Sequence, residues 1–172
     1  SRKGTLTGIA PVAQQADTPL MYWMFRESYP DEVKRAGYEY YDPRCSHTSS
    51  LSRCVFGALA AKLGMADEAH RQFVIAAEAD IAEGLEMESE SGIHVACMGG
   101  TWLAVATGFA GVWIREGKLQ IDPHLPTHWQ RLALTIAYCG KKIEIDIGRK
   151  SLTVRSLGGD TELEVNGNAL TA

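Results

Sequence analysis

The period of the hydrophobic pattern changes near residue 111, and this change limits the folds open to the chain. Over residues 1–110 apolar side chains recur three or four positions apart, as on one face of an α-helix. From residue 112 they alternate with polar side chains, as along a strand that buries one face. Helices followed by strands exclude an alternating strand–helix fold and predict an α+β chain, helical over 1–110 and β over 111–172.

Prolines mark where the first two helices begin. Pro19 and Pro30 stand where the first turn of a helix needs no backbone N–H, so helices should start at these points. The first continues through the apolar run 20–25, which predicts burial on most of its faces. The second should run towards Tyr41.

Residues 51–63 show the clearest helical spacing in the chain. Ser49 or Ser50 can cap this helix, and Gly64 supplies a left-handed residue to end it. A fourth helix should begin at Ala66, end at Gly84 and pack against the third as an antiparallel hairpin, because the connection is short. The expected buried face of the fourth helix consists of His70, Phe73, Val74, Ala77 and Ile81.

The last helix and the strands follow from glycines and alternation. A helix is expected from Trp102 to Phe109, opened by the turn Gly99-Gly100-Thr101. Glu116-Gly117 is typical of a hairpin turn between two short strands. Further strands are expected at 132–138, 142–147, 152–155 and 162–165, with a turn at 158–160. These strands predict a small antiparallel β-sheet or sandwich domain.

Charge and cysteine usage narrow the class of protein. The chain carries 17 Lys and Arg against 21 Asp and Glu, a net charge of −4 without a basic stripe, which argues against binding nucleic acid. No apolar run approaches the roughly 20 residues that span a membrane. The four cysteines form no C-x-x-C pair, so we expect reduced thiols, no metal, no organic cofactor and a cytoplasmic protein. Because the sequence begins at Ser1 without Met, we expect a longer parent protein.

Two polar segments are the candidates for function, since the chain has no P-loop, G-x-G-x-x-G, G-x-S-x-G or H-E-x-x-H motif. Residues 44–52 bring hydroxyls, an imidazole and a guanidinium to a helix N-terminus, which forms either an anion site or a helix cap with spare serines. Residues 90–102 contain His94, either a ligand or a hydrogen-bonded core residue. A third feature is a set of closely spaced glutamates, Glu83, Glu86, Glu88 and Glu90. They form either a solvated rim of the site, a cation site or the source of a catalytic base.

In combination the two segments resemble the C-terminal part of glycoside hydrolase family 65. That family contains the inverting maltose, trehalose, kojibiose and nigerose phosphorylases and a few related hydrolases. The resemblance covers most of the chain and rests on YYDPR at 40–44, HTSSLS at 47–52, GIH at 92–94, MGGTW at 98–102, GKL at 117–119 and PHLP at 123–126. It implies the last helices of an (α/α)6 barrel followed by the family's small C-terminal β-domain.

A phosphate site is the main functional implication of the resemblance. Members of the family hold inorganic phosphate, their co-substrate, beside the anomeric carbon of a disaccharide. On that pattern the phosphate ligands would be Ser49, Ser50 and His94, with help from Gly100 and Thr101. Hydroxyl and backbone donors at a helix terminus suit a dianion in a sugar pocket, so the residues agree with this implication.

The resemblance also implies residues that lie elsewhere. The general acid of the family is a glutamate upstream of the matching region, so this chain alone should be inactive. The intact parent should convert an α-glucosidic bond to β-glucose 1-phosphate with inversion. Gln15 matches a residue that contacts the sugar, whereas Gln14 replaces the family's usual lysine beside it. A homodimer fits the family.

Two other functions stay open. One is a hydrolase of the same family, of the trehalase or kojibiose-hydrolase type, whose base would come from Glu88 or Glu90. Residues 44–51 contain no carboxylate, which favours phosphorolysis over hydrolysis. The other is a carbohydrate-binding or assembly module without catalysis. As half of a helical barrel, it should dimerise or expose an apolar helix face.

Overall fold

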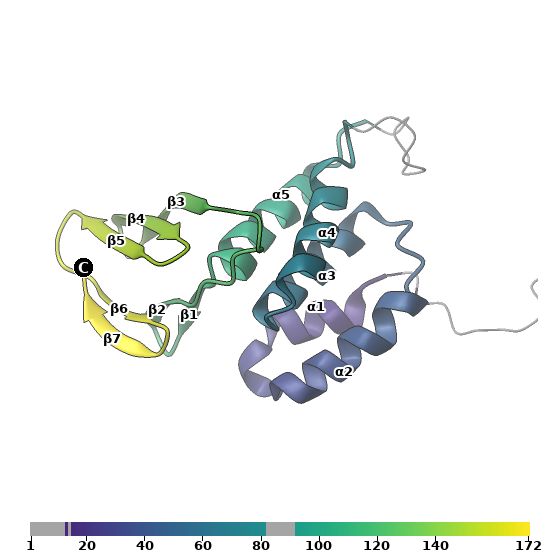
Figure 1. Ribbon diagram of the computed structural model, residues 1–172, viewed down its shortest axis with the longest axis horizontal. Coiled ribbons are helices and arrows are strands. Elements are labelled where there is room, and N and C mark those ends of the chain that lie inside the picture. The colour runs from purple at the N-terminus through teal and green to yellow at the C-terminus, as the bar shows by residue number, and fades with distance from the viewer. Residues whose placement is uncertain (1–12, 14, 82–91) are drawn as a thin grey trace, which may run out of the picture.

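The computed structural model describes residue 13 and residues 15–81 and 92–172. Within these ranges five α-helices form one part of the molecule and two small sheets form the other, as expected for an α+β chain (Figure 1). Gln14 and the glutamates of 83–90 lie outside the described residues. No helix in the described ranges combines the length and the apolar character needed to cross a bilayer.

The helical part begins with two helices that pack side by side. Its first elements are α1 (Asp17–Met24), η1 (Arg26–Ser28), α2 (Asp31–Tyr41) and η2 (Asp42–Arg44). Both helices begin where the prolines predict, with Pro30 as the N-cap of α2. The prediction that α1 is buried on most faces is wrong, because α2 and α3 cover only part of it and Pro19 is its one buried residue.

Helix α3 (Ser50–Lys62) is the centre of the helical part, with Phe56 and Leu59 fully buried. Gly64 ends it with φ 72°, and α4 (Ala66–Ala77) runs back against it, so the predicted hairpin is confirmed. The predicted face of α4 is wrong by one position. The buried residues of α4 are Ala69, Gln72 and Ala76, whereas Ile81 beyond it is 79% exposed.

Helix α5 (Val95–Leu103) and its π-helical continuation η4 (Ala104–Phe109) run parallel to α3. A Cβ atom added at Gly100 would lie 2.5 Å from the Cys54 sulfur, and one at Gly108 would lie 3.2 Å from the Ala58 Cα. From Gly100 to Gly108 along α5, the neighbouring residue on α3 changes from Cys54 to Ala58, so the two helices run in the same direction. The expected helix start after Gly99-Gly100-Thr101 is wrong, because Gly100 serves close helix packing rather than a turn.

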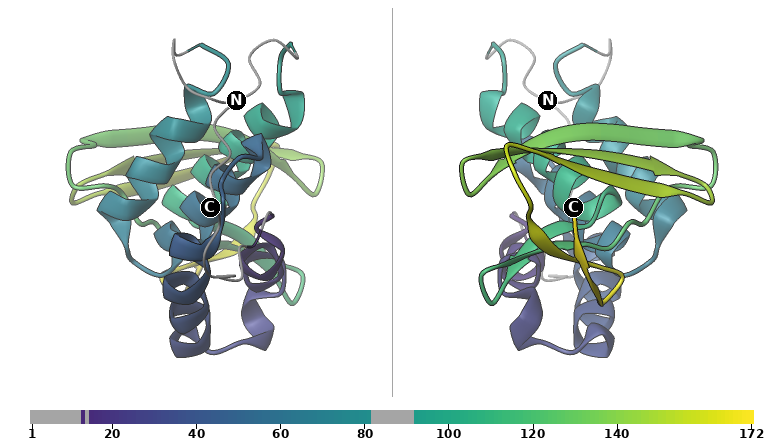
Figure 2. Two further views of the ribbon diagram at one scale, coloured as in Figure 1. Left: turned by 90° about the vertical axis from the view of Figure 1, so that its right-hand side faces the viewer. Right: turned by 90° about the vertical axis from the view of Figure 1, so that its left-hand side faces the viewer.

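The β part is a sandwich of two sheets, which confirms the predicted class (Figure 2). One sheet has the order β1-β2-β6-β7 and the other β3-β4-β5. Leu119, Ile121 and Leu163 of the first sheet share one core with Ile143 and Ile145 of the second. The strands are β1 (Val112–Arg115), β2 (Lys118–Ile121), β3 (Arg131–Tyr138), β4 (Lys141–Gly148), β5 (Leu152–Leu157), β6 (Glu162–Val165) and β7 (Asn168–Thr171).

The pairing of the strands differs from the expected antiparallel pairing at one place. Strands β2 and β6 pair in parallel, with Leu119 opposite Leu163. Strand β6 therefore lies in a different sheet from β5, and the 158–160 connection crosses between sheets instead of forming a hairpin. The predicted turn at Glu116-Gly117 is confirmed, with φ 51° and 77° at its two residues.

Side chains pack across the junction between the two parts. The Arg26 guanidinium lies 3.6 Å from the centre of the Trp113 ring, and burial lowers the pKa of Arg26 to about 10. At the end of α3, Lys62 donates to Asp122 at 2.9 Å. These residues line a cleft of about 520 Å³ between the helices and the sandwich.

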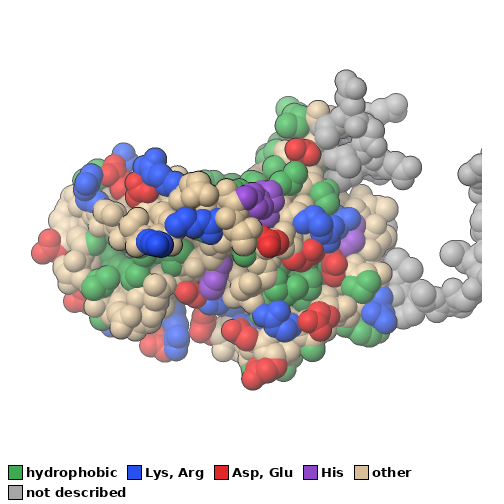
Figure 3. Space-filling model, viewed as in Figure 1, with side chains coloured by type: hydrophobic (Ala, Val, Ile, Leu, Met, Phe, Trp, Pro, Cys, Tyr) green, Lys and Arg blue, Asp and Glu red, His purple; other side chains and the backbone are tan. Residues whose placement is uncertain are grey.

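Apolar side chains also reach the surface of the helical part. Figure 3 shows hydrophobic side chains near the start of α5, and in this helix Val95 is 75% and Trp102 is 50% exposed. Leu103 of α5 is exposed as well. An exposed apolar helix face of this kind agrees with the expectation for part of a helical barrel.

Candidate functional site

The first turns of α3 and α5 lie at the same end of the helical part. The helices are parallel, and Cys54 is level with Gly100, so both helices begin about 6 to 8 Å before this contact. Helix α4 runs the opposite way and brings its C-terminal end to the same place (Figure 1). The fold thus brings Ser49 and Ser50 to the same end as His94. The positive ends of the α3 and α5 helix dipoles lie at this end, together with the negative end of the α4 dipole.

His94 is held at this end by Asp80, which follows α4. Asp80 Oδ1 lies 2.6 Å from His94 Nδ1, and Asp80 Oδ2 accepts a hydrogen bond of 2.9 Å from the His94 backbone N–H. The hydrogen bond from His94 lowers the pKa of Asp80. Asp80 is therefore ionised at neutral pH and lies at the N-terminus of α5, where a negative charge is favourable.

Ser49 and Ser50 open α3. Ser49 is the N-cap, and its Oγ accepts a hydrogen bond of 3.3 Å from the Leu51 backbone N–H. Ser50 is the first residue of the helix, and both serines are half-buried. A hydroxyl that accepts one hydrogen bond still has its own proton to donate. The cap and a further role as anion ligands are therefore compatible.

Gly100 and Thr101 lie inside α5 and face its packed side. The Gly100 backbone lies against Cys54, and Thr101 is buried. At this depth in a helix the backbone N–H groups bond to carbonyls one turn earlier, so these residues add no free N–H donors. Their contact with phosphate stays a prediction.

Gln15 lies beside the polar segment 44–52. The Ala13 N–H donates to the Arg44 carbonyl at 2.9 Å, and the Ser46 N–H donates to the Ala13 carbonyl at 2.9 Å. This short parallel bridge ties the start of the described chain to the segment. Gln15 follows it by two residues and is exposed. The residue expected to contact sugar is therefore near the segment expected to bind phosphate.

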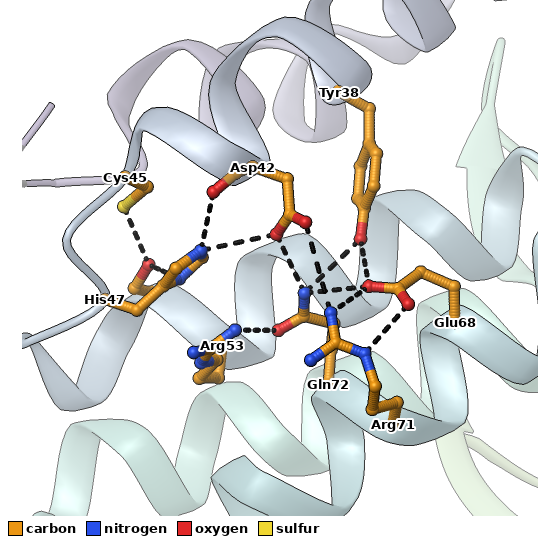
Figure 4. Close-up of polar contacts among 9 residues, drawn as sticks. Tyr38, Asp42, Cys45, His47, Arg53, Glu68, Arg71 and Gln72 are labelled. Carbon is orange, nitrogen blue, oxygen red and sulfur yellow. Dashed lines mark hydrogen bonds and ion pairs between the residues drawn. The ribbon is translucent and has the colours of Figure 1, made fainter. Parts of the chain in front are cut away.

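A polar network of partly buried side chains lies next to segment 44–52 (Figure 4). Gln72 is fully buried on α4, and its amide group donates to Asp42 at 2.9 Å and to Glu68 at 3.0 Å. Tyr38 donates to Glu68 at 2.9 Å, and Arg71 donates to Glu68 at 2.6 Å. The network joins α2, η2 and α4 next to residues 44–52.

His47 connects this network to α3. Its Nδ1 lies 2.9 Å from the Ser52 hydroxyl, and its Nε2 lies 3.0 Å from the Asp42 carbonyl. The ring also packs edge-on against Phe56, with centroids 4.9 Å apart. Both ring nitrogens have partners, and the backbone is left-handed with φ 52°. His47 thus holds the loop in shape while Ser49 and Ser50 remain at the helix start.

The charges of the network favour ionised carboxylates and a neutral phenol. Burial raises the pKa of Asp42, but the hydrogen bond and charge of His47 and the charge of Arg71 lower it below its ordinary value overall. Glu68 shows the same balance, because its hydrogen bonds with Arg71 and Tyr38 outweigh its burial. The pKa of Tyr38 is raised, mainly by burial and in addition by the charges of Asp42 and Glu68.

Thiol and metal chemistry find no support in the described part of the chain. Cys45, Cys54 and Cys97 are buried and free, and Cys139 is exposed and free. Burial raises the pKa of Cys54 to about 11, so this thiol is not a nucleophile at neutral pH. No group of three or more His, Cys, Asp or Glu in these ranges is arranged to hold a metal ion.

Sequence reasoning missed Asp80 and the buried network. Asp80 lies beyond the hydrophobic pattern of α4, and nothing local links it to His94. The usable signal was topological, because a helix that runs antiparallel to α3 ends where a helix parallel to α3 begins. A carboxylate at that position can cap the later helix.

The fold matches that of a solved structure described as a putative kojibiose phosphorylase from the human microbiome. The TM-score is 0.80, and the match covers 94% of this chain and 25% of that one at 21% identity. The described arrangement of helices and sandwich is therefore a known fold.

Family models identify both parts of the chain. The model for the glycosyl hydrolase family 65 central catalytic domain matches residues 7–103, and the model for the family 65 C-terminal domain matches residues 113–172. The chain belongs to glycoside hydrolase family 65. The resemblance noted in its motifs is confirmed.

Named relatives of the chain include several phosphorylases. An α,α-trehalose phosphorylase of Geobacillus stearothermophilus is 38% identical over 87% of this chain and 19% of its own length. A kojibiose phosphorylase of Caldanaerobacter subterraneus is 33% identical over 94% of this chain and 21% of its own length. A maltose phosphorylase of Bacillus subtilis is 31% identical over 86% and 19%. The chain spans about a fifth of the length of these relatives.

Proposed function

We propose that this chain is the C-terminal part of an inverting disaccharide phosphorylase and supplies the phosphate side of its active site. Family membership and the phosphorylase names of its relatives support this reading. Ser49, Ser50 and His94 are the proposed phosphate ligands. The general acid and most of the sugar site would come from upstream residues of the intact parent.

The meeting of two helix N-termini at Ser49 and His94 is the observation that carries the proposal. Each N-terminus offers backbone N–H groups and a favourable dipole to an anion. The hydroxyls of Ser49 and Ser50 and the imidazole of His94 add side-chain donors, and Asp80 holds that imidazole in place. Phosphate needs several donors around one point, and this end of the helices supplies them.

Phosphorolysis at such a site is a single displacement. A phosphate oxygen forms a bond to the anomeric carbon while the glycosidic C–O bond breaks. The upstream carboxylic acid gives its proton to the leaving oxygen, which departs as a free sugar. Attack from the opposite face inverts the anomeric centre, so an α-glucoside gives β-glucose 1-phosphate. Gln15 is the proposed contact to the glucosyl unit.

Hydrolysis would need a second carboxylate to activate water. Asp80 is the described carboxylate beside His94, and each of its oxygens already accepts a hydrogen bond from that residue. Glu88 and Glu90, the sequence candidates for such a base, lie outside the described residues. The proposed order of preference is therefore phosphorolysis before hydrolysis.

The test uses the intact parent protein. It is incubated with trehalose, maltose, kojibiose and nigerose, each with and without inorganic phosphate, and glucose 1-phosphate and free glucose are assayed. The proposal expects glucose 1-phosphate only when phosphate is present, from at least one disaccharide. Equal release of glucose with and without phosphate would identify a hydrolase and overturn the proposal.

A further inference from the structure

We propose that Asp80 is a positioning residue that fixes the His94 imidazole so that Nε2 is the ring nitrogen presented to phosphate. This inference rests on the proposed function. Asp80 Oδ1 lies 2.6 Å from Nδ1, and Oδ2 accepts the His94 backbone N–H at 2.9 Å. The carboxylate thus holds both the ring and the backbone of the residue that caps α5.

Asp80 and His94 are largely shielded from solvent, which strengthens the contact between them. The side chains of Asp80 and His94 are 14% and 18% exposed. Competition from water is therefore limited, and the short distance is that of a charge-assisted hydrogen bond. Such an arrangement parallels the carboxylates that orient metal-binding histidines from behind.

The chemistry of the two groups decides which nitrogen carries the proton. An ionised carboxylate only accepts hydrogen bonds, so Nδ1 must donate to Asp80. Nε2 lies on the other edge of the ring and has no hydrogen-bond partner among the described residues. In the doubly protonated ring Nε2 also carries a hydrogen, which it can donate to a phosphate oxygen.

The substitution Asp80→Asn separates the contact with the His94 backbone from the contact with its ring. The amide oxygen can still accept the His94 backbone N–H, but the amide nitrogen then faces Nδ1 as a donor. This reverses the hydrogen bond to the ring and removes the negative charge that accompanies an imidazolium. The cap of α5 survives, so the variant should fold, whereas Asp80→Ala removes both contacts.

Steady-state kinetics of the intact parent protein test the inference. Asp80→Asn should raise the KM for phosphate by roughly 10-fold or more, as second-shell carboxylates do for histidine ligands. The KM for the disaccharide should change less than twofold. Asp67→Asn on α4 is the matched control, because Asp67 accepts its hydrogen bond from Thr127 at the other end of that helix. That control should leave both constants unchanged.

A double-mutant cycle shows whether Asp80 acts through His94. In a His94→Ala background, Asp80→Asn should have no further effect on the KM for phosphate. Additive effects, or equal increases in both KM values, would overturn the inference and leave Asp80 a structural residue. If His94→Ala itself leaves the KM for phosphate unchanged, the proposed function fails first, and the inference fails with it.

Discussion

Gly100 of α5 lies directly against Cys54 of α3, and a Cβ atom at residue 100 would lie 2.5 Å from the Cys54 sulfur. The two backbones approach so closely because the glycine has no side chain. This contact fixes the position of α5 along the axis of α3. It therefore places His94 and Ser49 at the same end of the two helices.

Replacing this glycine should therefore destabilise the fold. Gly100→Ala gains helix propensity but forces α5 away from Cys54, at a net cost of about 1–3 kcal/mol. Gly99→Ala is the matched control, since nothing lies within 4 Å of its added Cβ. The control should be neutral or more stable by up to about 1 kcal/mol. Thermal unfolding measures both, and equal midpoints would contradict the packing argument.

The buried network predicts a cost for removing the Tyr38 hydroxyl. Tyr38→Phe deletes the hydrogen bond of 2.9 Å to the ionised Glu68 in a buried site. The expected loss of stability is about 1.5–3 kcal/mol in chemical denaturation. Tyr40→Phe, on the exposed side of α2, should change stability by less than about 0.5 kcal/mol. A similar loss in both variants would mean that the network does not hold the fold.

Acid should weaken the fold through the same network. The folded state lowers the pKa values of Asp42 and Glu68 below their ordinary values of about 4. Their contribution to stability is present above that pH and is lost as pH falls through the lowered pKa values, because the unfolded state binds protons first. Asp42→Asn should show a shallower loss of stability below about pH 4. An unchanged slope in that range would contradict the assignment.

The serines at the start of α3 should affect phosphate rather than sugar. Ser49→Ala and Ser50→Ala each remove a donor to a charged acceptor, so each should weaken phosphate binding by about 1.5–3 kcal/mol. Ser49→Ala should also lower stability by about 1 kcal/mol, because Ser49 caps the helix. Ser28→Ala in η1 is the control. If neither serine changes the KM for phosphate in the intact parent, the segment is only a helix cap.

The exposed apolar face of α5 gives a prediction for the chain on its own. Val95, Trp102 and Leu103 are exposed, so the isolated chain should bind a hydrophobic dye or self-associate. The intact parent should bind less dye per molecule. Trp102→Glu should reduce dye binding without changing the circular dichroism spectrum. A monodisperse isolated chain that binds no dye would contradict the account of a partial barrel.

Local signals predicted much of the helical part and the first hairpin. The α3 helix, the stop at Gly64 and the turn at Glu116-Gly117 depend on neighbours in sequence, and all three are confirmed. The face of α4 could not be predicted this way. Gln72 is polar, and it is buried only because Asp42 and Glu68 accept its hydrogen bonds in the folded chain.

Non-local features account for the other differences. The parallel pairing of Leu119 with Leu163 joins strands distant in sequence, which periodicity within a strand does not encode. The start of α5 was misplaced because Gly99 and Gly100 were interpreted as a turn, whereas the approach of Cys54 explains the second glycine. The serines and His94 were predicted from motifs, but Asp80 became visible only with the helices in place.

The central claim is that His94 and the first turn of α3 bind phosphate, and kinetics of His94→Ala in the intact parent test it most directly. The KM values for phosphate and for the disaccharide are measured side by side in both proteins. The account predicts that the KM for phosphate rises at least 10-fold while the KM for the disaccharide changes less than twofold. Equal increases in both constants would contradict it and make His94 a structural residue.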